Sequence, residues 1–171
     1  MAAEPTHRLF LALWPPPEAR DALVQHQSAW RWSEGTARVR PERLHVTLHF
    51  IGAVPQSRVA EVVPALQVPF TPSELDLSQG RPRAWHGGLA VLELHAPPAL
   101  LRLHQDLAQA LERAGLPLER RAYRPHVTLA RRAFGATPAA STPATTWQVR
   151  EGYALVRTLP AGGYESIGRY A

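Results

Sequence analysis

The tetrapeptide His-Val-Thr-Leu occurs twice in this chain, at residues 45–48 (motif 1) and at residues 126–129 (motif 2). A neutral imidazole accepts a proton and an imidazolium donates one, and an ordinary pKa of about 6.5 lets both forms exist near neutral pH. Threonine hydroxyls donate hydrogen bonds to the non-bridging oxygens of a phosphate. Two histidines and two threonines in one groove therefore suit concerted acid–base displacement at phosphorus.

Each motif lies in a run of β-branched and apolar residues that predicts a strand. Residues i and i+2 of a strand project from the same face, so we expect His45 to point with Thr47, and His126 with Thr128. The valine and the leucine of each motif then enter the core. Arg131 follows the second strand, where its guanidinium can donate charge-assisted hydrogen bonds to the same phosphate.

The two motifs are 126 − 45 = 81 residues apart, and the same offset relates four further pairs: Leu11 and Leu92, Leu13 and Leu94, Pro16 and Pro97, and Pro17 and Pro98. We infer a duplicated unit whose halves face each other about a pseudo-two-fold axis. The predicted fold is α+β, a single bilobal domain over 1–171 with β-α-β half-repeats at 8–80 and 89–171. Antiparallel or mixed sheets would form a central cleft, with the helices outside.

Hydrophobic periodicity, prolines and glycines predict the elements that position the motifs. Strands are expected over Arg8 to Trp14, Leu44 to Ile51, Leu89 to His95, Pro125 to Ala130, Trp147 to Thr158 and Tyr164 to Tyr170. Helices are expected from Pro16 or Pro17 to about Trp30, from Arg58 to Leu66 and from Leu100 to Ala114. Val68 to Leu77 is expected as an edge strand or extended connection, and Arg81 to Gly88 as a turn.

Composition limits the function classes. The chain has no cysteine, which excludes disulfides and thiolate metal sites. Its formal charge of +5 comes from arginine alone, which favours polyanionic partners such as RNA, although coding bias across a proteome would give the same composition. The apolar run Leu9 to Trp14 is too short to span a membrane, so we expect a soluble, cytoplasmic and monomeric protein.

Two other chemistries are less consistent with the sequence. A metal site built from His45, His49 and His126 is one alternative, but His45 and His49 in one strand lie roughly 13 Å apart at about 3.3 Å per residue. A hydrolase triad is the other, and no serine stands in a Gly-x-Ser-x-Gly context. We therefore expect neither a metal nor another cofactor.

The chain resembles the two-histidine phosphoesterase superfamily, whose signature is a pair of His-x-Thr/Ser-x motifs. More narrowly, it is similar to the RNA 2′,3′-cyclic phosphodiesterases first named as bacterial 2′-5′ RNA ligases. Three segments carry this resemblance: residues 8–13 followed by prolines, residues 40–48 running on to Gly52, and residues 124–131. They stand in the family's order and cover nearly the whole chain.

The resemblance implies metal-independent hydrolysis of an RNA or oligonucleotide 2′,3′-cyclic phosphate end to a 2′-phosphate. His126 would be the base that activates water and His45 the acid that protonates the departing 3′ oxygen. Thr47, Thr128 and Arg131 would hold the phosphate. The two motifs are identical, so sequence symmetry does not itself assign the acid and the base. The alternatives are 2′-5′ RNA ligation, which is the reverse reaction, and a non-catalytic RNA-binding module.

Substrate contacts beyond the phosphate are expected from aromatic and basic residues. Phe10 is the first candidate for stacking on a base, with Tyr123 and Trp147 as weaker candidates that also suit core packing. His49 is expected on the same face as His45, where it would touch the substrate chain. The segment from Trp30 to Arg43 interleaves aromatic and basic residues and is either an RNA-binding rim or a solvated loop.

Overall fold

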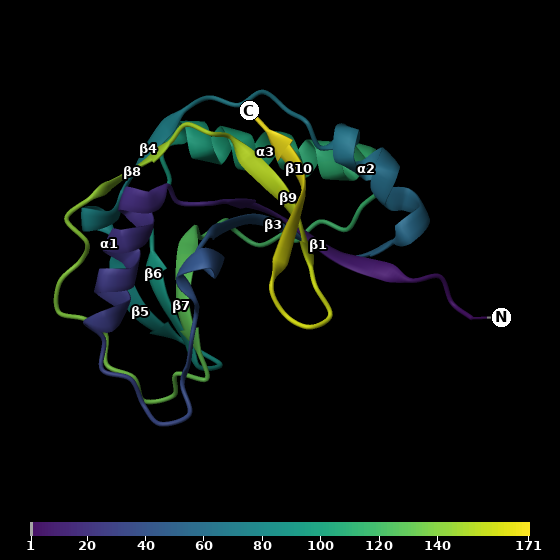
Figure 1. The fold of residues 1–171 in the computed structure, drawn as a ribbon. Helices are drawn as coiled ribbons and strands as arrows, with labels where there is room; N and C mark the ends of the chain where they lie inside the picture. Colours follow the sequence, from purple (N-terminus) through teal and green to yellow (C-terminus); the bar gives the residue numbers. More distant parts are fainter. Residues whose placement is uncertain (1) are drawn as a thin grey trace.

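The computed structural model describes residues 2–171, which form one large antiparallel sheet, one small sheet and three α-helices (Figure 1). The strands are β1 (Thr6–Leu13), β2 (Ala37–Arg38), β3 (Val46–Pro55), β4 (Ser73–Asp76), β5 (Arg81–Trp85), β6 (Leu89–Glu93), β7 (His126–Arg131), β8 (Thr146–Val149), β9 (Tyr153–Thr158) and β10 (Tyr164–Tyr170). The α-helices are α1 (Pro17–Ser28), α2 (Val59–Ala65) and α3 (Pro98–Arg113), and 3-10 turns cover Pro41–Arg43, Gln56–Arg58 and Leu77–Gln79. The predicted α+β class is confirmed.

The two motif strands lie side by side in the middle of the large sheet. Its order is β10-β9-β1-β3-β7-β6-β5, and β2 pairs with β7. The strands β3 and β7 are antiparallel and pair at Val46 and Val127, both of which are fully buried. On either side, β1 pairs with β3 as β6 pairs with β7. The order β1-β3-β7-β6 therefore repeats itself about a two-fold axis between the motifs.

The first strands of the two halves do not follow the offset of the motifs. Leu13 is the partner of Val46, and Leu92 is the partner of Val127. Positions in β1 and β6 thus correspond at an offset of 92 − 13 = 79 residues, whereas the motifs and the helix starts keep 81. The predicted correspondence of Leu13 with Leu94 was wrong, because the connection from strand to helix is two residues longer in the second half.

Each motif carries a β-bulge at its leucine. Leu11 pairs with His49 but Ala12 pairs with Thr47, which leaves Leu48 as the extra residue of β3. In the same way the register of β6 with β7 skips Leu129. A bulge resets the alternation of side chains between the two faces of a strand. The residues after each motif therefore face opposite to what simple alternation predicts.

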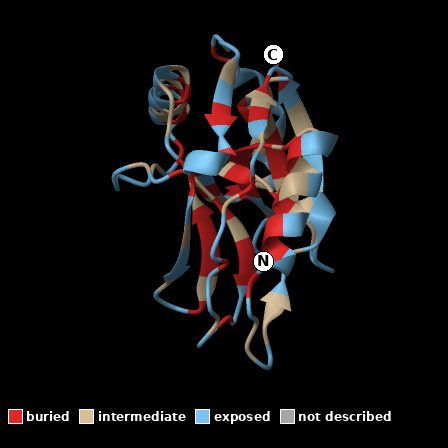
Figure 2. Ribbon diagram, turned by 90° about the vertical axis from the view of Figure 1, so that its left-hand side faces the viewer, coloured by how far each residue is buried: buried red, intermediate tan, exposed pale blue. Residues whose placement is uncertain are grey.

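Helix α1 follows β1 in the chain but packs on the half of the sheet that contains β7, and helix α3 follows β6 but packs on the half that contains β3. Gln27 of α1 donates from Nε2 to the carbonyl oxygens of Val39 and Leu129, at 2.9 and 2.8 Å, which fastens this helix beside β7. In α3, the His104 carbonyl accepts a hydrogen bond from His49 of β3. Figure 1 shows α1 beside β5, β6 and β7, and Figure 2 shows the inward faces of the strands and helices as buried. Each half of the internal repeat thus contributes a helix to the hydrophobic core of the other half.

Two predicted segments differ from the structure. Residues 81–88 do not form only a turn, because Arg81–Trp85 is the edge strand β5, where Pro82 is tolerated since an edge residue needs no second ladder bond. The single strand expected over residues 147–158 is divided into β8 and β9 around Gly152. Gly152 has a φ of 87°, and a Cβ there would lie 1.6 Å from the Tyr170 carbonyl oxygen. The hairpin β9–β10 then joins β1, far from it in sequence.

Gln27→Leu is expected to lower the free energy of unfolding by about 1–3 kcal/mol, because it removes two donated hydrogen bonds and leaves carbonyls without that partner inside the protein. Gln25→Leu, on the exposed face of the same helix, is the matched control and should change stability by less than about 0.5 kcal/mol. Urea unfolding followed by circular dichroism measures both. Equal midpoints for the two variants would contradict the role given to Gln27.

Candidate active site

The paired motifs bring four polar side chains onto one face of the sheet. With Val46 opposite Val127 and antiparallel strands, His45 stands opposite Thr128 and Thr47 opposite His126. In such a ladder the Cβ atoms of opposed residues are about 5 Å apart and diagonal neighbours roughly 7–8 Å. The two histidines occupy one diagonal and the two threonines the other. This is the grouping that the sequence predicts.

Both imidazoles are held in the same way by main-chain oxygens. His45 donates from Nδ1 to the carbonyl oxygen of Arg43 at 2.7 Å, and His126 donates from Nδ1 to that of Arg124 at 2.8 Å. A carbonyl oxygen only accepts, so each neutral ring carries its proton on Nδ1 and leaves Nε2 available. Nε2 of His45 lies 3.1 Å from the Thr47 hydroxyl. Both rings are thereby fixed for proton transfer at Nε2.

The bulges add one more residue from each half to this face. Beyond its bulge, β7 turns Arg131 toward the motif side chains, and the positive charge of Arg131 lowers the pKa of both His45 and His126. The corresponding residue of β3 is Phe50, 81 positions earlier, which is 58% exposed. Phe50 was missed in the sequence, although its offset from Arg131 identifies it. One half supplies a guanidinium and the other an exposed aromatic ring.

His45 is packed among aromatic rings. Trp14 stacks on it with centroids 4.8 Å apart and planes inclined by 18°. Phe10 lies at 5.2 Å and the edge of Tyr164 at 5.5 Å. Phe10 is therefore part of the site, but it is only 5% exposed. Stacking of a substrate base on Phe10 does not fit this burial, because its neighbours already cover the ring, whereas Phe50 on the same face is largely exposed.

His126 has different neighbours. Glu93 of β6 is its cross-strand partner, and the Trp85 ring lies 4.4 Å from the His126 ring. The Glu93 carboxylate accepts hydrogen bonds from Trp85 Nε1 at 2.6 Å and from Arg124 Nη2 at 2.5 Å. Local sequence patterns gave no indication of this carboxylate, since it lies 33 residues before His126. Glu93 stands beside His126 at the position that Trp14 occupies beside His45.

Several other sequence candidates lie away from the site. His49 was expected to face the substrate, but the bulge at Leu48 turns it into the interior, where it is 4% exposed and stacks on His104 at 4.0 Å. Tyr123 covers the other face of His104 and donates from its hydroxyl to the Thr47 carbonyl oxygen at 2.9 Å, so it supports motif 1 from behind. Trp147 is a core residue.

The aromatic and basic segment near residue 30 is also divided by the structure. Trp30 is buried and stacks on Trp32 with centroids 5.1 Å apart, so both rings pack against the protein. The side chains of Arg38 and Arg40 are exposed, and β2 places Arg38 beside the end of β7. Arg38 and Arg40 are therefore accessible to a polyanion, whereas Trp30 and Trp32 are occupied by packing within the protein.

Two other kinds of feature are absent from residues 2–171. No three histidine, cysteine, aspartate or glutamate side chains are grouped closely enough to hold a metal ion. No helix in this part of the chain combines the length and apolar character needed to cross a membrane.

A family model described as the 2′-5′ RNA ligase superfamily matches residues 15–154. The chain belongs to this superfamily. A protein of Thermus thermophilus named RNA 2′,3′-cyclic phosphodiesterase is 32% identical, over 88% of this chain and 81% of the relative. A Bacillus subtilis protein of the same name is 30% identical, over 57% of this chain and 56% of the relative. The resemblance stated from the motifs is confirmed.

Solved structures agree with this membership of the 2′-5′ RNA ligase superfamily. The Thermus thermophilus protein TT0787 superimposes with a TM-score of 0.77 at 29% identity, covering 95% of this chain and 96% of the other. E. coli LigT complexed with 3′-AMP superimposes with a TM-score of 0.80 at 24% identity, covering 98% of each chain. The second likeness establishes the fold alone.

The two motif histidines, His45 and His126, differ in their electrostatic surroundings. The pKa of His45 is lowered to about 4, chiefly by burial and also by the charges of Arg131 and His126, while the hydrogen bond to the Arg43 carbonyl oxygen acts to raise it. Burial also lowers the pKa of His126, but there the Glu93 carboxylate acts in the opposite direction and stabilises the imidazolium. The identical motifs are therefore distinguished by residues outside them.

Glu93→Gln is expected to lower the pKa of His126, because the neutral amide no longer stabilises the imidazolium while Arg124 and Arg131 still oppose it. NMR titration of the histidine ring carbons measures the shift. Glu18→Gln on α1 is the matched control and should leave the His126 titration unchanged. A His126 pKa that is the same in Glu93→Gln and in the wild type would refute the electrostatic role of Glu93.

Proposed function

We propose that this protein hydrolyses 2′,3′-cyclic phosphate ends of RNA to 2′-phosphates without a metal, using His45 and His126 as acid and base. The observation that carries the proposal is the facing pair of histidines, each with Nδ1 bonded to a main-chain oxygen and Nε2 left for proton transfer. The names of the Thermus and Bacillus relatives support the substrate class. Their activity is carried over to this chain by family membership.

The reaction requires one proton to be taken and one to be given. His126 Nε2 removes a proton from water as the water oxygen bonds to phosphorus, and the bond from phosphorus to the 3′ oxygen breaks. His45 Nε2 gives its proton to that oxygen, leaving a free 3′ hydroxyl and a 2′-phosphate. Exchange with solvent then restores both histidines.

The surroundings of the histidines support this division of roles. A base becomes positively charged when it takes the proton, and Glu93 stabilises that charge on His126, as carboxylates do for catalytic histidines. An acid must lose its proton readily, which the buried position of His45 favours. The anionic substrate and the face of Trp14 both stabilise the protonated His45 before it reacts.

The remaining polar groups are placed to hold the phosphate. The Thr47 and Thr128 hydroxyls stand on the diagonal opposite to the histidines, so they flank any phosphate between the two rings. Arg131 brings a full positive charge to the same face, where charge builds on the non-bridging oxygens as water adds.

Two alternatives predict different products. In ligation a 5′ hydroxyl would attack phosphorus in place of water, break the same bond to the 3′ oxygen and leave a 2′-5′ linkage, and a non-catalytic RNA-binding module would leave the cyclic phosphate intact. The fixed Nε2 atoms favour catalysis, because binding alone needs no pair of titrating groups aimed at one point. Product analysis of a cyclic-phosphate-ended oligonucleotide separates the three.

In excess EDTA, the purified protein is expected to convert a nucleoside 2′,3′-cyclic phosphate to the 2′-phosphate. His45→Ala and His126→Ala should each lower kcat/KM by about 100-fold or more, because each removes one proton-transfer group. His86→Ala, at an exposed histidine outside the site, is the matched control and should keep wild-type activity. Wild-type rates in either motif variant, or complete loss in EDTA with recovery on adding a divalent cation, would overturn the mechanism.

The pH dependence of kcat/KM is expected to be bell-shaped, with its maximum below pH 6.5, because the pKa values of both histidines lie below this ordinary value. Raising the pH removes the proton that the acid must give, and lowering it protonates the base. The kcat profile should lie at higher pH, since the bound phosphate raises both pKa values. Stopped assays from about pH 3.5 to 8.5 measure both, and a kcat/KM that rises steadily to about pH 8 would count against this pair.

A further inference from the structure

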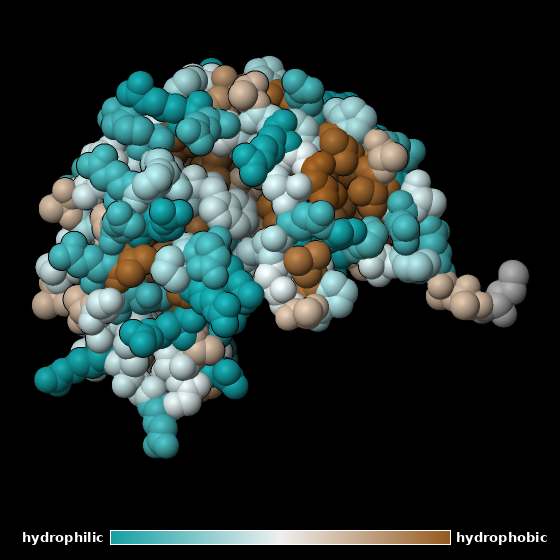
Figure 3. Space-filling view, viewed as in Figure 1, coloured by the Kyte–Doolittle hydropathy of each residue, from teal (hydrophilic) through white to brown (hydrophobic). Residues whose placement is uncertain are grey.

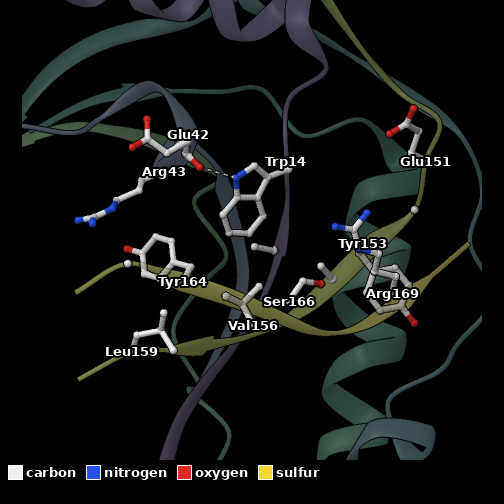
Figure 4. Close-up of a pocket in the computed structure, with 14 residues that line it drawn as sticks. Trp14, Glu42, Arg43, Glu151, Tyr153, Val156, Leu159, Tyr164, Ser166 and Arg169 are labelled. Atoms are coloured by element: carbon white, nitrogen blue, oxygen red, sulfur yellow. Dashed lines mark hydrogen bonds between the residues drawn. The ribbon is translucent and has the colours of Figure 1, made fainter. Parts of the chain in front are cut away.

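A pocket of about 570 Å³ lies beside His45, between the end of β1 and the β9–β10 hairpin (Figure 4). Its lining includes the apolar side chains of Ala12, Ala154 and Val156 and the aromatic rings of Trp14 and Tyr164. Figure 3 shows the molecule hollowed along its lower edge in this view, between the part that carries α1 and the hairpin. None of the phosphate-binding groups proposed above lines this pocket.

Two residues connect this pocket to the catalytic histidine. Trp14 lines the pocket and also stacks on the His45 ring at 4.8 Å. Arg43 lines it with its side chain, which lies against the hairpin turn where a Cβ on Gly163 would be 3.4 Å from Nη2. The carbonyl oxygen of the same Arg43 accepts the hydrogen bond from His45 Nδ1. Trp14 and Arg43 therefore belong both to the lining of the pocket and to the contacts that hold His45.

The lining combines aromatic rings with charged side chains, two arginines (Arg43 and Arg169) and two glutamates (Glu42 and Glu151). Trp14 is held in place because its Nε1 donates to the Glu42 carbonyl oxygen at 3.1 Å. Arg43 and Arg169 form no ion pair with any carboxylate of residues 2–171. The side chains of Glu42 and Glu151, which also line the pocket, are drawn in Figure 4 above Tyr164 and Arg169 in that view. Aromatic rings with free arginines are the combination that binds bases and phosphates of single-stranded nucleic acid.

Neither motif histidine lines the pocket, so the reacting phosphate lies outside it. His45 reaches the cyclic phosphate through Nε2, and the Trp14 ring stands between His45 and the pocket. A group in the pocket is thus separated from the catalytic ring by a whole aromatic side chain. When the cyclic phosphate is bound at His45, the group of the nucleic acid chain that lies beyond the terminal nucleotide is the neighbouring nucleotide.

We infer that this pocket binds the nucleoside immediately 5′ of the cyclic-phosphate nucleotide, with Trp14 and Tyr164 beside its base and Arg43 and Arg169 near the joining phosphodiester. The inference rests on the proposed function and makes the protein selective for RNA chains over single cyclic nucleotides. Its ligand is a single-stranded end of at least two nucleotides.

The first test compares two substrates on the unaltered protein: a nucleoside 2′,3′-cyclic phosphate and the dinucleotide with the same terminal nucleotide and cyclic end. The dinucleotide is expected to have a kcat/KM higher by about fivefold or more, the factor that stacking of one base contributes. Equal kcat/KM values for the two substrates would overturn the inference while leaving the proposed function intact. Failure to open either substrate would instead refute the proposed function.

The second test fills the pocket. Ser166 is exposed and lines it from β10, so Ser166→Trp places a ring where the base would lie. The ratio of dinucleotide to mononucleotide kcat/KM should fall toward one in this variant, and Arg169→Gln should lower it in part. Ser28→Trp, at an exposed serine on α1, is the matched control and should keep the wild-type ratio. Measuring a ratio within each variant separates occupancy of the pocket from damage to folding, and a wild-type ratio in Ser166→Trp would contradict the inference.

Discussion

The antiparallel pairing of Val46 with Val127 is the constraint on which the site depends. Both valines are fully buried, and side chains in a strand alternate between faces, so burial of the valines places the histidine and threonine of each motif on the opposite face. A slip of one residue in either strand would bury an imidazole and expose a valine. The same interaction therefore closes the core and assembles the four polar groups from two distant parts of the chain.

The face of the motif residues was predictable from sequence, but the face of the residues after them was not. Alternation places His45 with Thr47 correctly because both precede the bulge at Leu48. It fails at His49, which the bulge turns inward. Arg131 is brought to the site by the matching bulge at Leu129, whereas its position just after the strand had indicated its role without indicating which face it occupies. A bulge is specified by pairing with a neighbouring strand, and that pairing leaves no mark in the local hydrophobic pattern.

The limits of the strands and helices were largely predictable, whereas their partners were not. Leu9, Leu11 and Leu13 pack in the main core and Phe10 in a second cluster on the other face, as expected for a strand buried on both sides. Strand β9 pairs with β1, and helix α1 packs beside β7. Both arrangements depend on contacts between residues far apart in the chain. Gln27 illustrates the difficulty: its sequence context is an ordinary helix, but its amide joins two chain segments that meet only after folding.

The internal repeat indicated the site from the sequence, but it gave no indication that the residues beside its two histidines differ. At the offset of 81 that relates the motifs, Trp14 corresponds to His95, which is exposed. At the offset of 79 that relates β1 to β6, Trp14 corresponds to Glu93. One structural position beside each motif histidine thus holds an aromatic ring in one half and a carboxylate in the other. Burial lowers the pKa of both histidines, and only at His126 does a carboxylate, that of Glu93, act against it. Two histidines with equal surroundings could not be told apart as acid and base, and the carboxylate beside only one of them removes that equivalence.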